Sequence, residues 1–252
     1  MIVILLNLSN RFEGKLEKLE DLITIREEDA KYLNFDFQKI TKIIPILQKI
    51  NKMIGLENIK ETIFYQITLL LSGEKMPLHT FIHGDLGTGK TLFSNLLTKL
   101  YMILLYNKDE NIEKQIILVD EDLMPREVYN VLRNYVEKNE KIVIFVCSKK
   151  FKGKISELSP NFRGVFPFRF KFESYESAQL VSILEMTGEW KFTKKLSNQI
   201  NDLLSENKEH FGFQGADIKN YISFVKMAYI KRKLLQRFLK KCSFFQKNTC
   251  NN

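Results

Sequence analysis

The 252-residue sequence predicts an α/β fold, in which a three-layer domain with a parallel sheet precedes a small helical domain. Short β-prone apolar runs alternate with helical periods up to residue 172, an order typical of parallel sheets with helices on their faces. Beyond that point the apolar residues keep only a helical period. Hydrophobic residues make up 44% and charged residues 27%, which excludes a largely disordered chain and a fibrous repeat.

The elements of the first domain follow from changes in the apolar period. Pro45 is expected to disturb or end the first helix, and Gly73 and Pro77 close the second. In chain order we expect helices over 37–47 and 59–71, a strand over 79–83, a helix over 91–106, a strand over 116–119, a helix over 126–138, and strands over 142–146 and 166–172.

The second domain is predicted to contain helices over 177–186, 193–206 and 216–240. In the last helix an apolar stripe should face the core while lysines point to solvent. The stripe consists of Tyr221, Phe224, Met227, Leu234, Leu235 and Phe238. The predicted organisation is an N-terminal segment of unknown role (1–44), the α/β domain (45–172), the helical domain (173–241) and a C-terminal tail (242–252).

The net charge of +9 is concentrated at one end of the chain. Nine Lys and Arg and no acidic residue lie in 218–252, so residues 1–217 are neutral overall. A cationic helix without acids favours a nucleic acid or an acidic protein as partner, and a solvated helix is an equal alternative.

The cysteines and the apolar segments indicate a cytoplasmic protein that does not enter a membrane. Cys147, Cys242 and Cys250 have no metal-ligand spacing and suit a reducing compartment. The apolar opening 2–6 is far shorter than the ~20 residues that a membrane helix needs, and we expect no signal peptide because a basic leader and a cleavage site are lacking.

The most informative motif is a complete G-x-x-x-x-G-K-[ST] loop between the predicted strand at 79–83 and the following helix. Glycines let the backbone wrap an anion, and the helix start offers N–H groups and a positive dipole end. We expect Lys90 to reach the β and γ phosphates of ATP and the Thr91 hydroxyl to ligate Mg²⁺. The alternative is a glycine-rich turn that binds nothing. The expected nucleotide-binding residues of the loop are Gly84, Asp85, Leu86, Gly87, Thr88, Gly89, Lys90 and Thr91.

Two acids follow the strand predicted at 116–119. Asp120 is expected at the carboxyl end of a strand beside the loop, where parallel sheets place ligands, as a second group for the metal. Glu121 would polarise the attacking water. The alternative is a solvated acidic turn.

Together these motifs resemble the AAA+ ATPases, and within them the CbxX/CfqX type, including versions found in large DNA viruses. Segment 53–60 is similar to the family's entry segment, which implies that Ile54 and Gly55 line the adenine pocket. The resemblance also implies a polar sensor at Ser148, an arginine finger in the turn 159–167, with Arg163 as its candidate, and a lid made by the helical domain. ATP, Mg²⁺, a protein partner and assembly into a ring or smaller oligomer are implied with them.

The sequence departs from the family pattern at three places. Only 29 positions separate Thr91 from Asp120, about half the family's interval, so a strand–helix unit with the pore loop is missing and the Asp120 strand becomes a sheet edge. Arg163 stands two residues before the expected finger position, Val165, a shift of about 7 Å in an extended chain. Ala216 replaces an arginine at the lid sensor.

The leading hypothesis is ATP hydrolysis that remodels or assembles an unknown protein partner. Because the pore loop is missing and the finger is displaced, a catalytically degenerate, nucleotide-dependent scaffold is an alternative. A nucleic-acid-associated ATPase that uses the basic C-terminal helix is another. The expected compartment is the cytoplasm, or the host cytoplasm for a viral protein.

Overall fold

A computed structural model describes residues 16–105, 116–120, 134–135, 138, 141–148, 166–207, 209 and 214–249, with the backbone alone for 120 and 237–249. The chain forms two compact units, Met1–Ser174 and Tyr175–Asn252. No helix in these described ranges is long and apolar enough to cross a bilayer. The helix predicted over 126–138 falls outside the described ranges apart from residues 134, 135 and 138.

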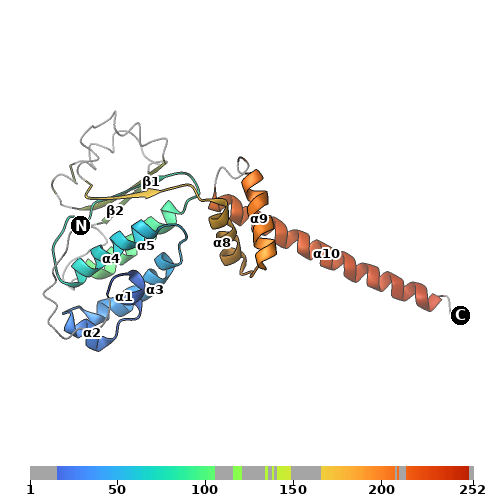
Figure 1. Cartoon of the computed structure of the whole chain (residues 1–252), viewed down its shortest axis with the longest axis horizontal. Helices are drawn as coiled ribbons and strands as arrows, with labels where there is room; N and C mark the ends of the chain where they lie inside the picture. Colours follow the sequence, from blue (N-terminus) through green and yellow to red (C-terminus); the bar gives the residue numbers. More distant parts are fainter. Residues whose placement is uncertain are drawn as a thin grey trace. The chain divides into compact units, whose positions relative to one another are not determined.

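The first unit contains a four-stranded parallel sheet with helices packed beside it, which confirms the predicted α/β class (Figure 1). Its strands are β1 (Thr80–Gly84), β2 (Ile116–Asp120), β3 (Ile142–Ser148) and β4 (Phe168–Phe172), in the spatial order β2-β3-β1-β4. All three pairings are parallel.

The strand that carries Asp120 lies at one edge of the described sheet, as expected from the shortened interval. The expectation that this strand lies directly beside the loop strand is wrong, because β3 separates β2 from β1. Burial explains the order: β3 is buried from Val143 to Cys147, as a central strand must be, whereas Leu118 on β2 is 38% exposed.

The helices of the first unit are α1 (Leu19–Ile23), α2 (Glu27–Tyr32), α3 (Phe37–Asn51), α4 (Glu57–Leu71) and α5 (Lys90–Leu105). α3 packs against α5, and Lys39 Nζ donates to the Leu104 carbonyl at 2.8 Å. Leu22 of α1 belongs to the same hydrophobic core as the buried face of α3. Residues 19–44 therefore share the core of the α/β unit, and the boundary predicted at residue 45 falls inside α3.

Pro45 neither ends nor divides α3, contrary to the prediction, because the helix continues to Asn51. The side chains of Pro45 and Thr41 are exposed, so the carbonyl of Thr41, which lacks an i+4 donor, lies on the solvent side. Ile43 and Leu47, on the other side of the helix, are completely buried. Packing of this apolar face thus outweighs the local penalty of the proline.

The second unit consists of α8 (Ser177–Gly188), α9 (Lys194–Glu206) and α10 (Gly215–Thr249), so all three predicted helices are present. The Thr193 side chain caps α9 by accepting from the Leu196 N–H. α8 packs against both α9 and α10, and Leu184, Leu204 and Ile218 are buried.

α10 differs from the prediction in two respects. It continues to Thr249, so most of the predicted tail is helical. The apolar stripe does not face a core, since Phe224, Met227, Leu234 and Leu235 are 57–64% exposed. Helix length explains the difference: 12 residues of α8 extend about 18 Å, whereas 35 residues of α10 extend about 52 Å, so α8 covers only a part of α10. The Phe238 side chain lies outside the described ones.

Candidate functional site

The loop 84–91 connects the end of β1 to the start of α5, as the motif predicts. Gly84, Gly87 and Gly89 have φ angles of +152°, +72° and +94°. Residues with a Cβ atom rarely adopt these backbone angles. The three glycines therefore let the backbone curve around a point in front of α5.

Gly84 also lies too close to the neighbouring strand for any larger residue. A Cβ built on it would stand 2.8 Å from both the carbonyl carbon and the Cβ of Phe172, and closer still to the carbonyl oxygen. Gly84 and Phe172 are register partners in the β1–β4 pair, so the contact is backbone to backbone and cannot be relieved by a side-chain rotation.

Lys90 places a cation inside this turn. Its side chain is buried, and Nζ donates to the carbonyl of Gly84 at 3.0 Å and to that of Asp85. The Thr88 hydroxyl donates to the same Asp85 carbonyl at 2.8 Å. These bonds hold the ammonium group at the N-terminus of α5, where the helix dipole adds further positive potential.

Thr91 follows Lys90 on the first turn of α5, and its side chain is exposed. Its carbonyl accepts from the Ser94 hydroxyl at 3.0 Å. Leu86, at the crest of the loop, is 41% exposed. Thr91 is thus an exposed residue that directly follows Lys90, which suits a metal ligand that completes its shell with water.

The register of the sheet places two other predicted residues relative to the loop. Ser148 is the partner of Gly84 on β3, so the predicted sensor stands directly beside the start of the loop. Asp120 is the partner of Val146, which is itself the partner of Ile82. Asp120 therefore lies two strands from β1, about 10 Å away, and two residues below the level of Gly84.

The remaining described site residues, Ile54 and Gly55, are not part of the loop. Ile54 and Gly55 lie in the turn between α3 and α4, where Gly55 has a φ of +73°. α4 packs against α5, the helix that begins at the loop. Glu121 and Arg163 lie outside the described residues, and their predicted roles stay predictions.

One contact of the loop was not predicted from the sequence. The Ser174 hydroxyl, two residues after β4, forms a short hydrogen bond with Asp85 Oδ2. Ser174 is also the last residue of the first unit. No local pattern indicates this pair, because the two residues are 89 positions apart and meet only since β4 pairs with β1.

The loop has the geometry of a site for an anionic group. A turn with three positive-φ glycines, a buried ammonium and the first turn of a helix converge on one point at the carboxyl ends of parallel strands. The acceptor-rich phosphates of a nucleotide match these donors, and the accessible Thr91 hydroxyl matches a hard cation bound to such phosphates.

No family model matches the chain. The sequence is 25% identical, over an alignment of 275 positions, to a cfxQ-like protein of Acanthamoeba polyphaga mimivirus. This alignment covers 90% of the chain but only 65% of the viral relative. The match supports a distant relationship between the two proteins.

Proposed function

We propose that the chain is an AAA+-like ATPase that binds Mg-ATP at the loop 84–91 and hydrolyses it to remodel or assemble a protein partner. The observation that carries the proposal is the buried ammonium of Lys90 inside a glycine turn at the start of α5. A buried ammonium at the start of a helix favours an anionic ligand, because charge-assisted hydrogen bonds to phosphate oxygens are stronger than those to the Gly84 and Asp85 carbonyls. The distant cfxQ-like relative supports the same proposal.

The roles of the individual residues follow from their places. Lys90 would exchange its carbonyl acceptors for the β and γ phosphates, and Thr91, with Asp120 on the outer side of β3, would hold the metal shell. Bound Mg²⁺ would supply Lewis-acid polarisation of the phosphate oxygens. Ser148, beside Gly84, would donate to the same phosphate group. We assign Glu121 the orientation of water and Arg163 the place of a displaced finger, and we assign Ile54 and Gly55 contact with the adenine.

Calorimetric titration with Mg-ATP tests the binding site. Lys90→Ala should weaken ATP binding at least tenfold, since one charge-assisted hydrogen bond contributes about 1.5–3 kcal/mol. Lys99→Ala is the matched control, because Lys99 is an exposed lysine on the same helix. Equal ATP affinity of the two variants would show that the site is assigned to the wrong place.

A nucleotide-dependent scaffold that does not hydrolyse ATP is the second candidate. The position of β2 at the edge of the described sheet favours it, because this is the arrangement expected when the strand–helix unit with the pore loop is missing. Steady-state turnover, measured over a range of protein concentrations with and without DNA, separates the candidates. Turnover that Glu121→Gln abolishes while ATP stays bound supports the ATPase, and binding without turnover under every condition supports the scaffold.

Stimulation of turnover by DNA would favour the third candidate, a nucleic-acid-associated ATPase. Its physical basis is the concentration of nine Lys and Arg in 218–252. If counterion release drives such binding, it should weaken steeply as salt is raised. The proposed compartment is the cytoplasm, which for a viral protein is the host cytoplasm.

A further inference from the structure

The helix α10 carries a row of large apolar side chains that the second unit leaves uncovered. Ile218 and Ile222 near its start are buried, but Phe224 is 64%, Met227 57% and Leu234 58% exposed. Figure 1 shows α10 continuing past α8 and α9. A row of large apolar side chains that is exposed on a helix marks an interaction site.

A cation interrupts this row in the middle. Phe224, Met227, Lys231 and Leu234 follow one another at spacings of 3, 4 and 3 residues, which places them along one face of the helix. We call this row the seam. Lys226 and Lys233 each lie two residues beyond a seam residue and so belong to other faces. Lys233 Nζ lies 5.8 Å from the centroid of the Tyr229 ring.

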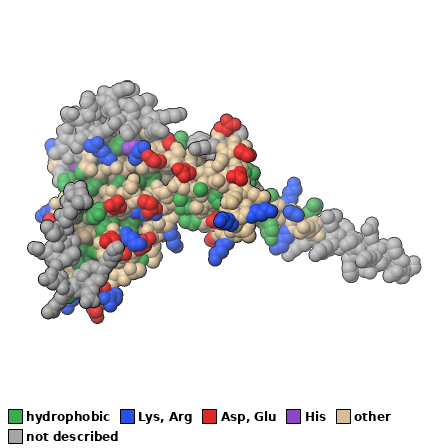
Figure 2. Space-filling model, in the orientation of Figure 1, with side chains coloured by type: hydrophobic (Ala, Val, Ile, Leu, Met, Phe, Trp, Pro, Cys, Tyr) green, Lys and Arg blue, Asp and Glu red, His purple; other side chains and the backbone are tan. Residues whose placement is uncertain are grey.

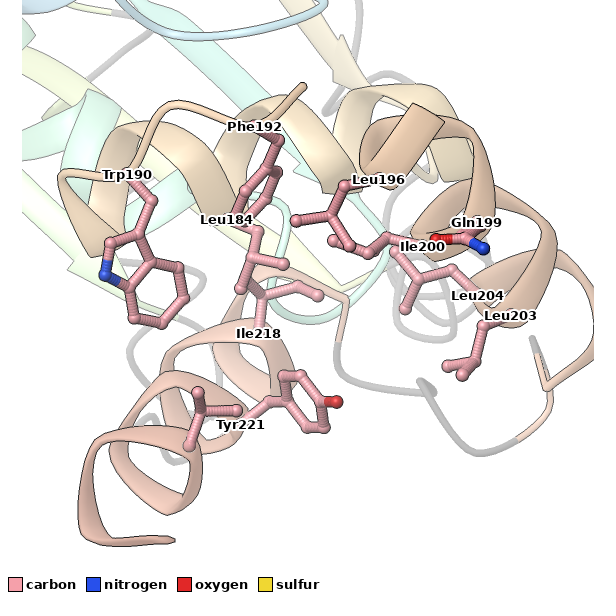
Figure 3. A pocket seen from close by; sticks show the side chains of 11 residues that line it. Leu184, Trp190, Phe192, Leu196, Gln199, Ile200, Leu203, Leu204, Ile218 and Tyr221 are labelled. Atoms are coloured by element: carbon pink, nitrogen blue, oxygen red, sulfur yellow. The ribbon is translucent and has the colours of Figure 1, made fainter. Parts of the chain in front are cut away.

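The seam continues into a groove of about 390 Å³ within the same unit (Figure 3). α8, the turn after it, α9 and the start of α10 contribute to its walls. These are mostly apolar, and their polar side-chain groups are the Gln199 amide, the Tyr221 hydroxyl and the Trp190 indole N–H. Tyr221 lines the groove and precedes the first seam residue by three positions. Leu203 and Tyr221 are 49% and 41% exposed, so the groove is open to a partner.

We propose that the groove and the seam together bind an amphipathic helix of an acidic partner protein. Apolar side chains of that helix would fill the groove and cover Phe224, Met227 and Leu234, the helix-in-groove mode of recognition. A carboxylate of the partner would pair with Lys231, since no acidic residue of this chain lies between 218 and 252. Figure 2 shows basic and hydrophobic side chains next to each other along the described stretch of α10.

Charge argues against two other occupants of the seam, a second copy of the chain and a membrane. Pairing of α10 with its copy over residues 218–252 would bury Lys231 among further cations, because the one carboxylate of α10, Asp217, lies outside this range in the first turn. Burial of an unpaired ion costs several kcal/mol. A membrane-surface helix carries its cations on the polar face, whereas Lys231 stands within the apolar row of the seam.

Fluorescence anisotropy on the full-length chain, without nucleotide, tests the inference independently of ATP binding. The probe is a labelled synthetic helix of about 18 residues, five helical turns, with Leu at helical spacing and Glu elsewhere. We expect binding that Phe224→Ser, Leu234→Ser and Lys231→Glu each weaken about tenfold or more. Lys226→Glu is the matched control and should change the affinity less than about threefold, because it removes the same charge from a different face.

Several outcomes would overturn the inference. One is no binding of the Leu/Glu helix to the wild-type chain, and another is equal binding of a Leu/Lys helix with the same Leu positions. If Lys226→Glu and Lys231→Glu weaken binding of the labelled helix equally, binding depends on net charge and not on the seam. A dimer in light scattering that Phe224→Ser abolishes would assign the seam to a second copy. If the chain sediments with vesicles of phosphatidylcholine and phosphatidylserine and Phe224→Ser does not, the seam binds a membrane. Because all substituted side chains are exposed, circular dichroism should show unchanged helix content.

Discussion

Replacing Gly84 by alanine tests whether the loop depends on close contact between β1 and β4. The added Cβ would stand 2.8 Å from two atoms of Phe172, one of them in the backbone. It would also hold a φ of +152° that alanine rarely adopts. Strain of this backbone kind costs about 1–2 kcal/mol, and overpacking against an immobile neighbour adds about 1–3 kcal/mol. We therefore expect a loss of about 2–5 kcal/mol in the free energy of unfolding.

Gly73→Ala separates the two contributions. Gly73 also has a positive φ, +80°, but a Cβ there would meet nothing within 4 Å. Gly73→Ala should therefore lower the free energy of unfolding by the backbone strain alone, about 1–2 kcal/mol. Urea unfolding followed by circular dichroism gives both values, and hydrogen exchange of peptides from β1 and β4 shows where the Gly84 variant opens. Equal losses in the two variants would refute the contact between Gly84 and Phe172 as the cause.

Two further substitutions test the packing of the first unit. Pro45→Ala should raise the free energy of unfolding, measured in urea, by about 1–2 kcal/mol, because it restores an N–H donor to the Thr41 carbonyl within α3. A lower free energy of unfolding in the variant would mean that the proline does not destabilise α3. Tyr101→Phe should lower the free energy of unfolding by about 1–2 kcal/mol at neutral pH, because it removes the 3.2 Å bond to Gln66 Oε1 in a buried site. Burial raises the pKa of Tyr101, so near pH 10 this side chain ionises in the unfolded chain and stays neutral in the folded one. Ionisation favours the unfolded wild type, so its free energy of unfolding falls as the pH rises through about 10. The difference in free energy of unfolding between the wild type and Tyr101→Phe should therefore narrow above about pH 10. A difference that does not change with pH would contradict the raised pKa of Tyr101.

The elements were predictable from the sequence because they depend on local patterns. Apolar period and turn residues located α3, α4 and α5 within a few residues, and the motif located the loop 84–91. The strand order was predicted only in part: the Asp120 strand was expected at an edge, as it is, and beside the loop strand, which is wrong. One observation bears on the order, since the run 142–146 is apolar on both faces, as a central strand requires, whereas 116–120 ends in an acid.

Burial was the least predictable property, because it depends on what lies beside an element. Pro45 was expected to end a helix that packing against α5 maintains. The apolar stripe of α10 was expected in a core, but α8 is too short to cover it. Helical period shows which residues share a face and cannot show whether a neighbour covers that face. The same holds for the contact between Asp85 and Ser174, which the β1–β4 pairing alone creates.

The contact of Asp85 with Ser174 has a consequence for phosphate binding that can be measured. Asp85 puts a carboxylate into the proposed phosphate loop, where its charge opposes a bound anion, and the Ser174 hydroxyl holds that carboxylate toward the end of β4. Ser174→Ala should therefore weaken Mg-ATP binding about fivefold, the value of one hydrogen bond, because the carboxylate then loses one of the groups that hold it away from a bound phosphate. In the Asp85→Asn background the charge is gone, and Ser174→Ala should change ATP affinity little. Calorimetry on the four proteins completes a double-mutant cycle. An equal loss in both backgrounds would show that the hydroxyl acts on nucleotide binding by a route other than Asp85.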